Sequence, residues 1–457
     1  MQNNWFSSGL FVLSFIAFFS FSSCSIAQES PLEQETDLFL SFFSPRSNAD
    51  HQESIKALDQ NWQEGYAVMV LEVIYLLRNR EVSDRLLRLL QRKTGQQTDY
   101  AFNDWYTYLW QQSQTSFADY DNFKARLYQR IDPVFGPYFQ DRGESAKIRL
   151  DEVRWGGVLQ DGIPPLRQPE MIAASEAQYL NDDNVVFGIA VNGDVRAYPK
   201  RILAWHEMFV DEVGGVPVAG VYCTLCGTVI LYKTEHEGVR HQMGTSGFLY
   251  RSNKLMYDRA TQSLWNTLQG EPVIGPLAGK GIQFDYLSVV TTTWGEWRKR
   301  HPETKVLSLN TGHRRDYGEG VAYQQYFGTD ALMFNTPFTD RRLKNKAEVL
   351  SLRQGEDQLA ISARYLKKRP VYHTEINGQK VVIFTDRSGA NRVYEAAEHS
   401  FTDYDQLFSV IDDTGQKWEV KEHELIASDG QRLKRFPAHR TFWFGWRAAY
   451  PETRLVK

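Results

Sequence analysis

The sequence predicts an α+β fold, in which a small helical N-terminal domain over residues 53–150 precedes a β-rich domain over residues 151–457. Apolar side chains recur at helical spacing in the first part, whereas glycines, prolines and short apolar runs alternate in the second. An internal repeat predicts that the β-rich domain is built from two degenerate copies, over about residues 180–310 and 350–457.

Composition places the chain among globular proteins. Its 457 residues include 42% hydrophobic residues, enough for a sizeable core and too many for a generally disordered chain. The 52 basic residues are balanced by 56 acidic ones, which leaves a net charge of −4. A nucleic-acid partner is therefore not expected. Aromatic residues reach 14% and favour a β-rich core over a ring-stacking cleft.

The first 27 residues have the features of a secretion signal. An apolar run over residues 9–19 has signal-peptide length and is shorter than a membrane span. Cys24 ends a segment that loosely resembles a lipobox and would then carry a lipid, whereas Ala27 completes an alternative cleavage site. We expect a polar tether, followed by a short apolar patch, over residues 28–52. The protein is therefore expected to be exported, either periplasmic or a membrane-anchored lipoprotein, with the lipid as its membrane contact.

Three apolar stripes predict the helices of the N-terminal domain. Each stripe follows i, i+3, i+4 spacing or forms a dense leucine or aromatic cluster, with polar residues in between. Core packing is the expected role of these side chains, rather than cofactor binding. The stripes are Tyr66, Met69, Val70, Val73, Ile74 and Leu77, then Leu86, Leu87, Leu89 and Leu90, and finally Phe102, Trp105, Tyr106, Leu109 and Trp110.

Strand signals begin after residue 150. The apolar run at residues 185–191 is followed by Asn192-Gly193, a dipeptide typical of a two-residue hairpin turn. Residues 195–198 would form the return strand, and residues 216–222 and 229–232 predict two more strands. Residues 294–300 are a candidate helix within this β-rich part.

The internal repeat is clearest around two tryptophan-rich segments, at residues 292–306 and 441–455. Residues 215–232 can likewise be laid over residues 378–395, strand on strand. In this alignment neither Cys223 nor Cys226 has a counterpart, so any cysteine chemistry belongs to the first copy. The gap-free matches in the tryptophan-rich segments are Trp294, Trp297, Arg298, Pro302, Glu303 and Thr304 with Trp443, Trp446, Arg447, Pro451, Glu452 and Thr453.

The first copy contains the candidate site. The chain has three cysteines, and setting aside Cys24 leaves Cys223 and Cys226 in a Cys-x-x-Cys-Gly loop between two strands. Such a loop is typical of metal sites, because the glycine permits a tight turn whose N–H groups stabilise thiolates. His206 is the predicted third ligand, and zinc or copper is the predicted ion, since thiolates favour soft metals. Additional candidate ligands are Glu207, His241 and Asp258.

Two alternatives to a metal site stay open. A thiol redox protein would place an exposed Cys223 at the start of a helix, yet residues 227–232 predict a strand. A non-catalytic binding or interaction module of the cell envelope would use the pair as a disulfide. The distance from His206 to the sulfurs separates these hypotheses. The sequence identifies no substrate, partner or catalytic residue.

A polar stretch that follows the predicted strand at residues 229–232 is a candidate pocket lining. It includes hydroxyl, amide and guanidinium groups within a few residues of one another. The alternative is a tight loop in which serine and asparagine cap turns. The candidate pocket residues are Ser246, Tyr250, Arg251 and Asn253.

Several of these motifs, taken in order, carry a family resemblance. They include Asp161-Gly162-Ile163-Pro164, Arg196-Ala197-Tyr198-Pro199, Trp205-His206-Glu207, the loop at residues 222–228, Met256-Tyr257-Asp258 and Ser263-Leu264-Trp265. Over about residues 150–457 the chain resembles the bacterial and archaeal family known as domain of unknown function 3179. The resemblance implies an exported or membrane-associated protein with a Cys-x-x-Cys loop. It implies no established reaction, so function has to be argued from the site.

Overall fold

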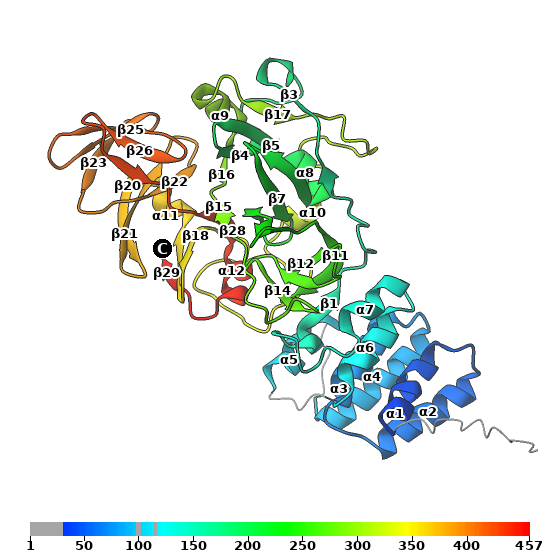
Figure 1. Ribbon diagram of the computed structural model, residues 1–457. Helices are drawn as coiled ribbons and strands as arrows, with labels where there is room; N and C mark the ends of the chain where they lie inside the picture. Colours follow the sequence, from blue (N-terminus) through cyan, green and yellow to red (C-terminus); the bar gives the residue numbers. More distant parts are fainter. Residues whose placement is uncertain (1–30, 97–101, 113–116) are drawn as a thin grey trace, which may run out of the picture.

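The computed structural model describes residues 31–96, 102–112 and 117–457 (Figure 1). The predicted secretion signal, with Cys24 and Ala27, lies outside these residues. Helices dominate the N-terminal part and strands the remainder, which confirms the α+β fold class. No helix in the described ranges is long and apolar enough to cross a membrane.

The N-terminal helices pack around one aromatic and aliphatic core. Ser47 starts one helix with a capping box, accepting a hydrogen bond from the Asp50 N–H while the Asp50 carboxylate accepts one in return. Gly95 ends another in the left-handed conformation that favours glycine. The helices are α1 (Pro31–Leu40), η1 (Ser41–Phe43), α2 (Asn48–Gln60), α3 (Tyr66–Leu76), α4 (Arg80–Thr94), α5 (Phe102–Gln111), α6 (Tyr120–Tyr128) and α7 (Gly136–Phe139).

The predicted polar tether at residues 28–52 is wrong where the structure describes it. Residues 31–43 form α1 and η1, and α2 begins at Asn48. Phe39 and Phe42 are buried in the helical core. The physical reason is the apolar content of this segment, which gains more from packing on α3 than from solvation.

The helical core continues into the β-rich part. Phe248, on strand β11 (Met243–Tyr250), contacts the rings of Tyr128, Phe135 and Phe139 at centroid distances of 5.2, 4.9 and 5.1 Å. Strand β1 (Val153–Trp155) pairs with β11 and joins the two parts of the chain. The helices therefore contribute to a shared hydrophobic cluster rather than packing only on themselves.

The first copy opens with the predicted hairpin, β4 (Val185–Val191) and β5 (Asp194–Pro199), whose Asn192-Gly193 turn has positive φ at both residues. Helix α8 (Lys200–His206) follows. The strands after it are β6 (Met208–Val213), β7 (Val216–Cys223), β8 (Thr228–Lys233), β9 (Glu235–His236), β10 (Val239–Arg240), β11, β12 (Asn253–Asp258), β13 (Leu264–Asn266), β14 (Glu271–Ile274) and β15 (Tyr286–Leu287). The copy closes with β16 (Val290–Thr293), α9 (Trp294–Arg300) and β17 (Lys305–Leu307). Strands β2 (Leu166–Arg167) and β3 (Met171–Ala173) precede the hairpin.

The second copy repeats this order. It begins with the hairpin β18 (Glu348–Gln354) and β19 (Asp357–Ser362), followed by α11 (Ala363–Lys367). Its later elements are β20 (Val371–Ile376), β21 (Gln379–Thr385), β22 (Asn391–Glu395), β23 (Phe401–Tyr404), β24 (Ser409–Asp412), β25 (Lys417–Val420), β26 (Glu424–Ala427), β27 (Arg432–Lys434), β28 (His439–Phe442), α12 (Trp443–Ala449) and β29 (Arg454–Val456). Helix α10 (Gln324–Phe327) lies in the segment between the copies.

The two copies share pairing as well as order. The first has the strand order β16-β4-β5-β17 and the second β28-β18-β19-β29, and the last pair is parallel in both. The Trp297 indole N–H donates to the Thr304 hydroxyl at 3.0 Å, and the Trp446 indole N–H donates to the Thr453 hydroxyl at 2.8 Å. The repeat in sequence thus corresponds to a repeat in structure.

Each copy also contacts the other through equivalent strands. Strand β28 of the second copy lies against β8 of the first, and β16 of the first lies against β22 of the second. The Thr228 and Thr441 hydroxyls meet in the first contact, and the Thr292 and Ser388 hydroxyls meet at 3.1 Å in the second. In Figure 1, α12 accordingly returns from the end of the chain to lie beside the first copy.

Candidate functional site

The Cys-x-x-Cys loop is the tip of a β-hairpin. Strands β7 and β8 are antiparallel, with Cys223 opposite Thr228, and the Cys226 N–H donates to the Cys223 carbonyl at 3.1 Å. Gly227 closes the turn with a φ of +60°, which side chains rarely adopt. Cys223 and Cys226 form a disulfide with their Cα atoms 5.3 Å apart. The strand predicted after the loop is confirmed, and no helix begins at Cys223.

The disulfide is enclosed by segments distant in sequence. Cys223 is 2% exposed and Cys226 is 1% exposed. The Tyr326 hydroxyl, from the segment between the copies, donates to the Leu225 carbonyl at 2.8 Å. The Phe442 N–H, from the second copy, donates to the Cys226 carbonyl at 2.7 Å. The loop therefore touches both the connecting segment and the second copy.

Helix α12 packs directly on the disulfide. A Cβ atom placed on Gly445 would lie 3.0 Å from the Cys226 Cβ and 3.3 Å from the Asn253 Oδ1. The Asn253 amide donates to the Gly445 carbonyl at 3.2 Å. Glycine at this position thus permits a close approach between the second copy and the cysteine loop.

His206 ends helix α8 and is buried, and both nitrogens of its ring have protein partners. Its Nδ1 lies 2.9 Å from the Pro164 carbonyl and its Nε2 lies 2.6 Å from the Tyr317 hydroxyl. Burial lowers the pKa of His206 to about 4, with smaller contributions from His313 and Arg315. Within the described residues no group of three His, Cys, Asp or Glu side chains could hold a metal ion. The zinc or copper site stays a prediction.

Glu207 is engaged by a lysine. This residue directly follows α8 and adopts the left-handed conformation, and its Oε2 lies 2.9 Å from the Lys254 Nζ. The Tyr323 hydroxyl donates to Glu207 Oε1 at 3.2 Å. The Glu207 carbonyl accepts from the Tyr222 N–H at 2.8 Å, which places this pair beside the strand that ends in Cys223. Burial lowers the pKa of Lys254, while the Glu207 carboxylate favours its charged form.

Lys254 and Tyr323 were missed by sequence reasoning. Lys254 lies on β12, where every residue is buried, so a single lysine within a buried strand was the available signal. A buried lysine needs an anionic partner, and Glu207 supplies it. Nothing local in the sequence indicates Tyr323, because its approach depends on the course of the segment between the copies.

His241 and Asp258, both predicted as additional ligands of the metal site, lie close together, but they pair with each other. The His241 Nδ1 lies 3.2 Å from the Asp258 Oδ2, and both residues are buried. Asp258 also accepts from the Thr261 hydroxyl at 3.0 Å and the Ala260 N–H at 3.1 Å. These contacts describe a carboxylate that caps a turn and orients an imidazole.

The four candidate pocket residues lie on the β11–β12 hairpin and bind protein groups. Ser246 donates to the Leu255 carbonyl at 2.7 Å and accepts from the Phe248 N–H at 3.0 Å. Arg251 forms an ion pair with Glu152, and Tyr250 lies beside it with the Arg251 guanidinium 5.0 Å from its ring centre. Asn253 donates its amide hydrogen bond to the Gly445 carbonyl of α12. These contacts resemble the turn-capping alternative more than an open pocket.

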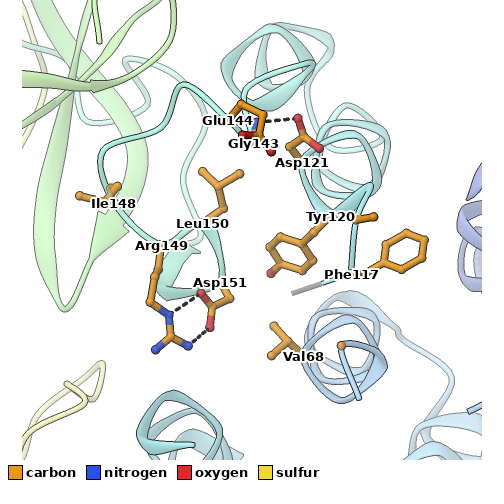
Figure 2. A pocket seen from close by; sticks show the side chains of 12 residues that line it. Val68, Phe117, Tyr120, Asp121, Gly143, Glu144, Ile148, Arg149, Leu150 and Asp151 are labelled. Carbon is orange, nitrogen blue, oxygen red and sulfur yellow. Dashed lines mark hydrogen bonds and ion pairs between the residues drawn. The ribbon is translucent and has the colours of Figure 1, made fainter. Parts of the chain in front are cut away.

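A cavity of about 480 Å³ lies in a region that sequence reasoning did not select, between the helices and the connection to the β-rich part (Figure 2). Three of its charged side chains, Asp121, Arg149 and Asp151, already have partners in the protein. Arg149 binds Asp151 through two hydrogen bonds, and Asp121 accepts from the Arg142 and Gly143 N–H groups at 2.7 Å each. These three side chains therefore serve internal interactions of the protein.

The comparisons with known proteins agree with the motif order. A family model described as "Protein of unknown function (DUF3179)" matches residues 160–453. A search of curated proteins and a search of solved structures found no match. The matched range begins after the helices and covers both copies and the cysteine loop. The chain therefore belongs to the DUF3179 family, and its N-terminal helices precede the family's domain.

Proposed function

We propose that this protein is an exported, non-catalytic binding module of the cell envelope, in which the Cys223–Cys226 disulfide is a structural clamp. The observation that carries the proposal is the position of the loop, which contacts the second copy through Phe442 and the connecting segment through Tyr326. A cross-link at such a junction fixes the turn that both neighbours bind.

The buried disulfide also supports export. Disulfides persist in oxidising compartments and are rare in the cytosol. The predicted secretion signal would deliver the chain to such a compartment, and a lipid on Cys24 would keep it at a membrane. Both the route and the anchor are part of the proposal.

The other two hypotheses have less support. Redox catalysis requires a thiol that a partner can reach, whereas both cysteines are buried and Cys223 ends a strand rather than starting a helix. A metal site requires two free thiolates and further ligands, and both ring nitrogens of His206 already have partners. The structural disulfide is the hypothesis that accounts for the contacts of the loop.

A thiol count on protein recovered from its cellular compartment tests the proposal. The Cys24→Ser chain, purified without reductant and unfolded in denaturant, should show no reactive thiol until a reductant is added. Elemental analysis of the same sample distinguishes the metal hypothesis. Free thiols with stoichiometric zinc or copper would overturn the clamp and support the metal site. Free thiols without metal would also overturn it.

A further inference from the structure

The second copy carries a basic surface on α11, the counterpart of α8, and on the turn that corresponds to the cysteine loop of the first copy. We define this basic surface as Arg364, Lys367, Lys368, Arg369 and Arg387, all of which are exposed. The first four lie on or directly after α11, and Arg387 lies in the turn between β21 and β22. The chain as a whole has a net charge of −4, so this concentration of positive charge is local.

Several contacts bring the helix and the turn together. The Thr385 N–H donates to the Pro370 carbonyl at 2.8 Å, which joins the segment after α11 to the strand before the turn. A Cβ atom on Gly389 would lie 3.9 Å from the Lys367 side chain, so this lysine extends over the same turn. Arg387 therefore belongs to the same surface as the basic residues of α11.

The charges of the basic surface are not neutralised within the protein. Among the described residues, no carboxylate forms an ion pair with any of its five side chains, whereas the nearby Asp386 is buried and paired with Arg392. Arg369 places its guanidinium 3.7 Å from the ring centre of Tyr365, which in turn contacts Tyr372 edge-on at 5.4 Å. Two half-buried tyrosines thus border the cationic groups.

The first copy shows what the same positions do when they are used internally. Arg201, which aligns with Arg364, donates to the Tyr179 carbonyl at 2.9 Å. The residues aligned with Lys367, Lys368 and Arg369 are Ala204, Trp205 and His206. The second copy therefore has exposed cationic side chains at positions where the first copy has the buried Ala204 and His206 and the half-buried Trp205, and this exposed charge is available to an external anion.

We infer that the basic surface docks the protein on a lipid bilayer that carries anionic headgroups. This inference rests on the proposed envelope location, and it adds a second contact beside the N-terminal lipid anchor. Clustered lysines and arginines bind anionic bilayers through the surface potential, each contributing roughly a fivefold gain in partitioning. Tyrosines suit the boundary between headgroups and water, which favours a bilayer over a soluble anion.

Vesicle sedimentation of the full Cys24→Ser chain tests the inference without a lipid anchor. We expect binding to phosphatidylcholine vesicles containing about one third phosphatidylglycerol, and no binding to pure phosphatidylcholine. The Lys367→Glu, Lys368→Glu, Arg369→Glu variant should lose more than about a hundredfold in partitioning, because it removes three cations and adds three anions. Raised salt should weaken binding of the wild type. Reversing three exposed charges elsewhere, Arg259→Glu, Lys280→Glu and Lys299→Glu, changes the net charge equally and should weaken binding far less.

The outcomes separate the possible explanations. Equal losses in the two triple variants would mean that net charge alone drives binding and would overturn the docking surface. Equally tight binding of a soluble anionic polysaccharide, with the same loss in the first variant, would overturn the assignment to a bilayer. Circular dichroism checks that each variant is folded. If the triple glutamate variant of the basic surface unfolds, the neutral Lys367→Gln, Lys368→Gln, Arg369→Gln variant takes its place. Vesicle binding is independent of the thiol count, so either proposal can fail alone.

Discussion

Breaking the Cys223–Cys226 cross-link should destabilise the β-rich domain by a modest and calculable amount. The two cysteines are three residues apart, so the closed loop is very short. Chain-entropy arguments give about 2 kcal/mol for a loop of roughly four residues, less than for a long loop. Reduction leaves both sulfurs in place, and it should therefore lower the free energy of unfolding by about this amount.

Urea denaturation followed by near-ultraviolet circular dichroism, with and without reductant, measures this loss. The Cys223→Ala, Cys226→Ala variant should be less stable than the oxidised wild type and should no longer respond to reductant. Asp386→Ala, at the aligned position of the second copy, is the matched control. It breaks a buried ion pair with Arg392 and should lower stability, yet it should keep the full response to reductant. Identical unfolding midpoints for the oxidised and reduced wild type would refute the clamp.

Three further changes probe contacts that surround the site. Lys254→Met should lower the free energy of unfolding by about 3–5 kcal/mol, because it leaves the Glu207 carboxylate buried without its cation; a neutral effect in urea denaturation would contradict the pairing. Burial lowers the pKa of His439 from 6.5 to about 3, so the unfolded chain binds a proton that the folded chain does not. His439 alone should thus lower stability by about 2 kcal/mol as the pH falls from above 6.5 to 5, and His439→Gln should reduce the slope of melting temperature against pH by this contribution while that of His206 remains. Gly188→Ala would place a Cβ 2.3 Å from the Trp297 ring and should cost about 1–3 kcal/mol, seen as a lower melting temperature; an unchanged value would mean that α9 can shift freely.

The local pattern of the sequence was enough to find the cysteine loop of the candidate site. It could not identify the distant residues that contact this site. The Cys-x-x-Cys-Gly spacing and the flanking apolar runs predicted a turn between two strands, which β7 and β8 confirm. The same reasoning predicted His206 as a third ligand, but it did not predict the partners of its ring nitrogens, Pro164 and Tyr317. Tyr317 lies 111 residues further along the chain, and no periodicity reports on such a contact.

Local patterns in the sequence were enough to predict the fold class, the repeat and the family. Side-chain periodicity, the Asn192-Gly193 turn and the matched tryptophan segments depend on interactions within a few residues, which a linear pattern records directly. Tertiary structure decided whether residues 31–43 would be a tether or a helix, and it decided which group would neutralise Glu207. It also decided that the cysteine loop would lie beneath the second copy. These outcomes depend on how surfaces far apart in sequence pack, because burial sets the cost of each unpaired charge and only the assembled core fixes which partner is close enough to meet it.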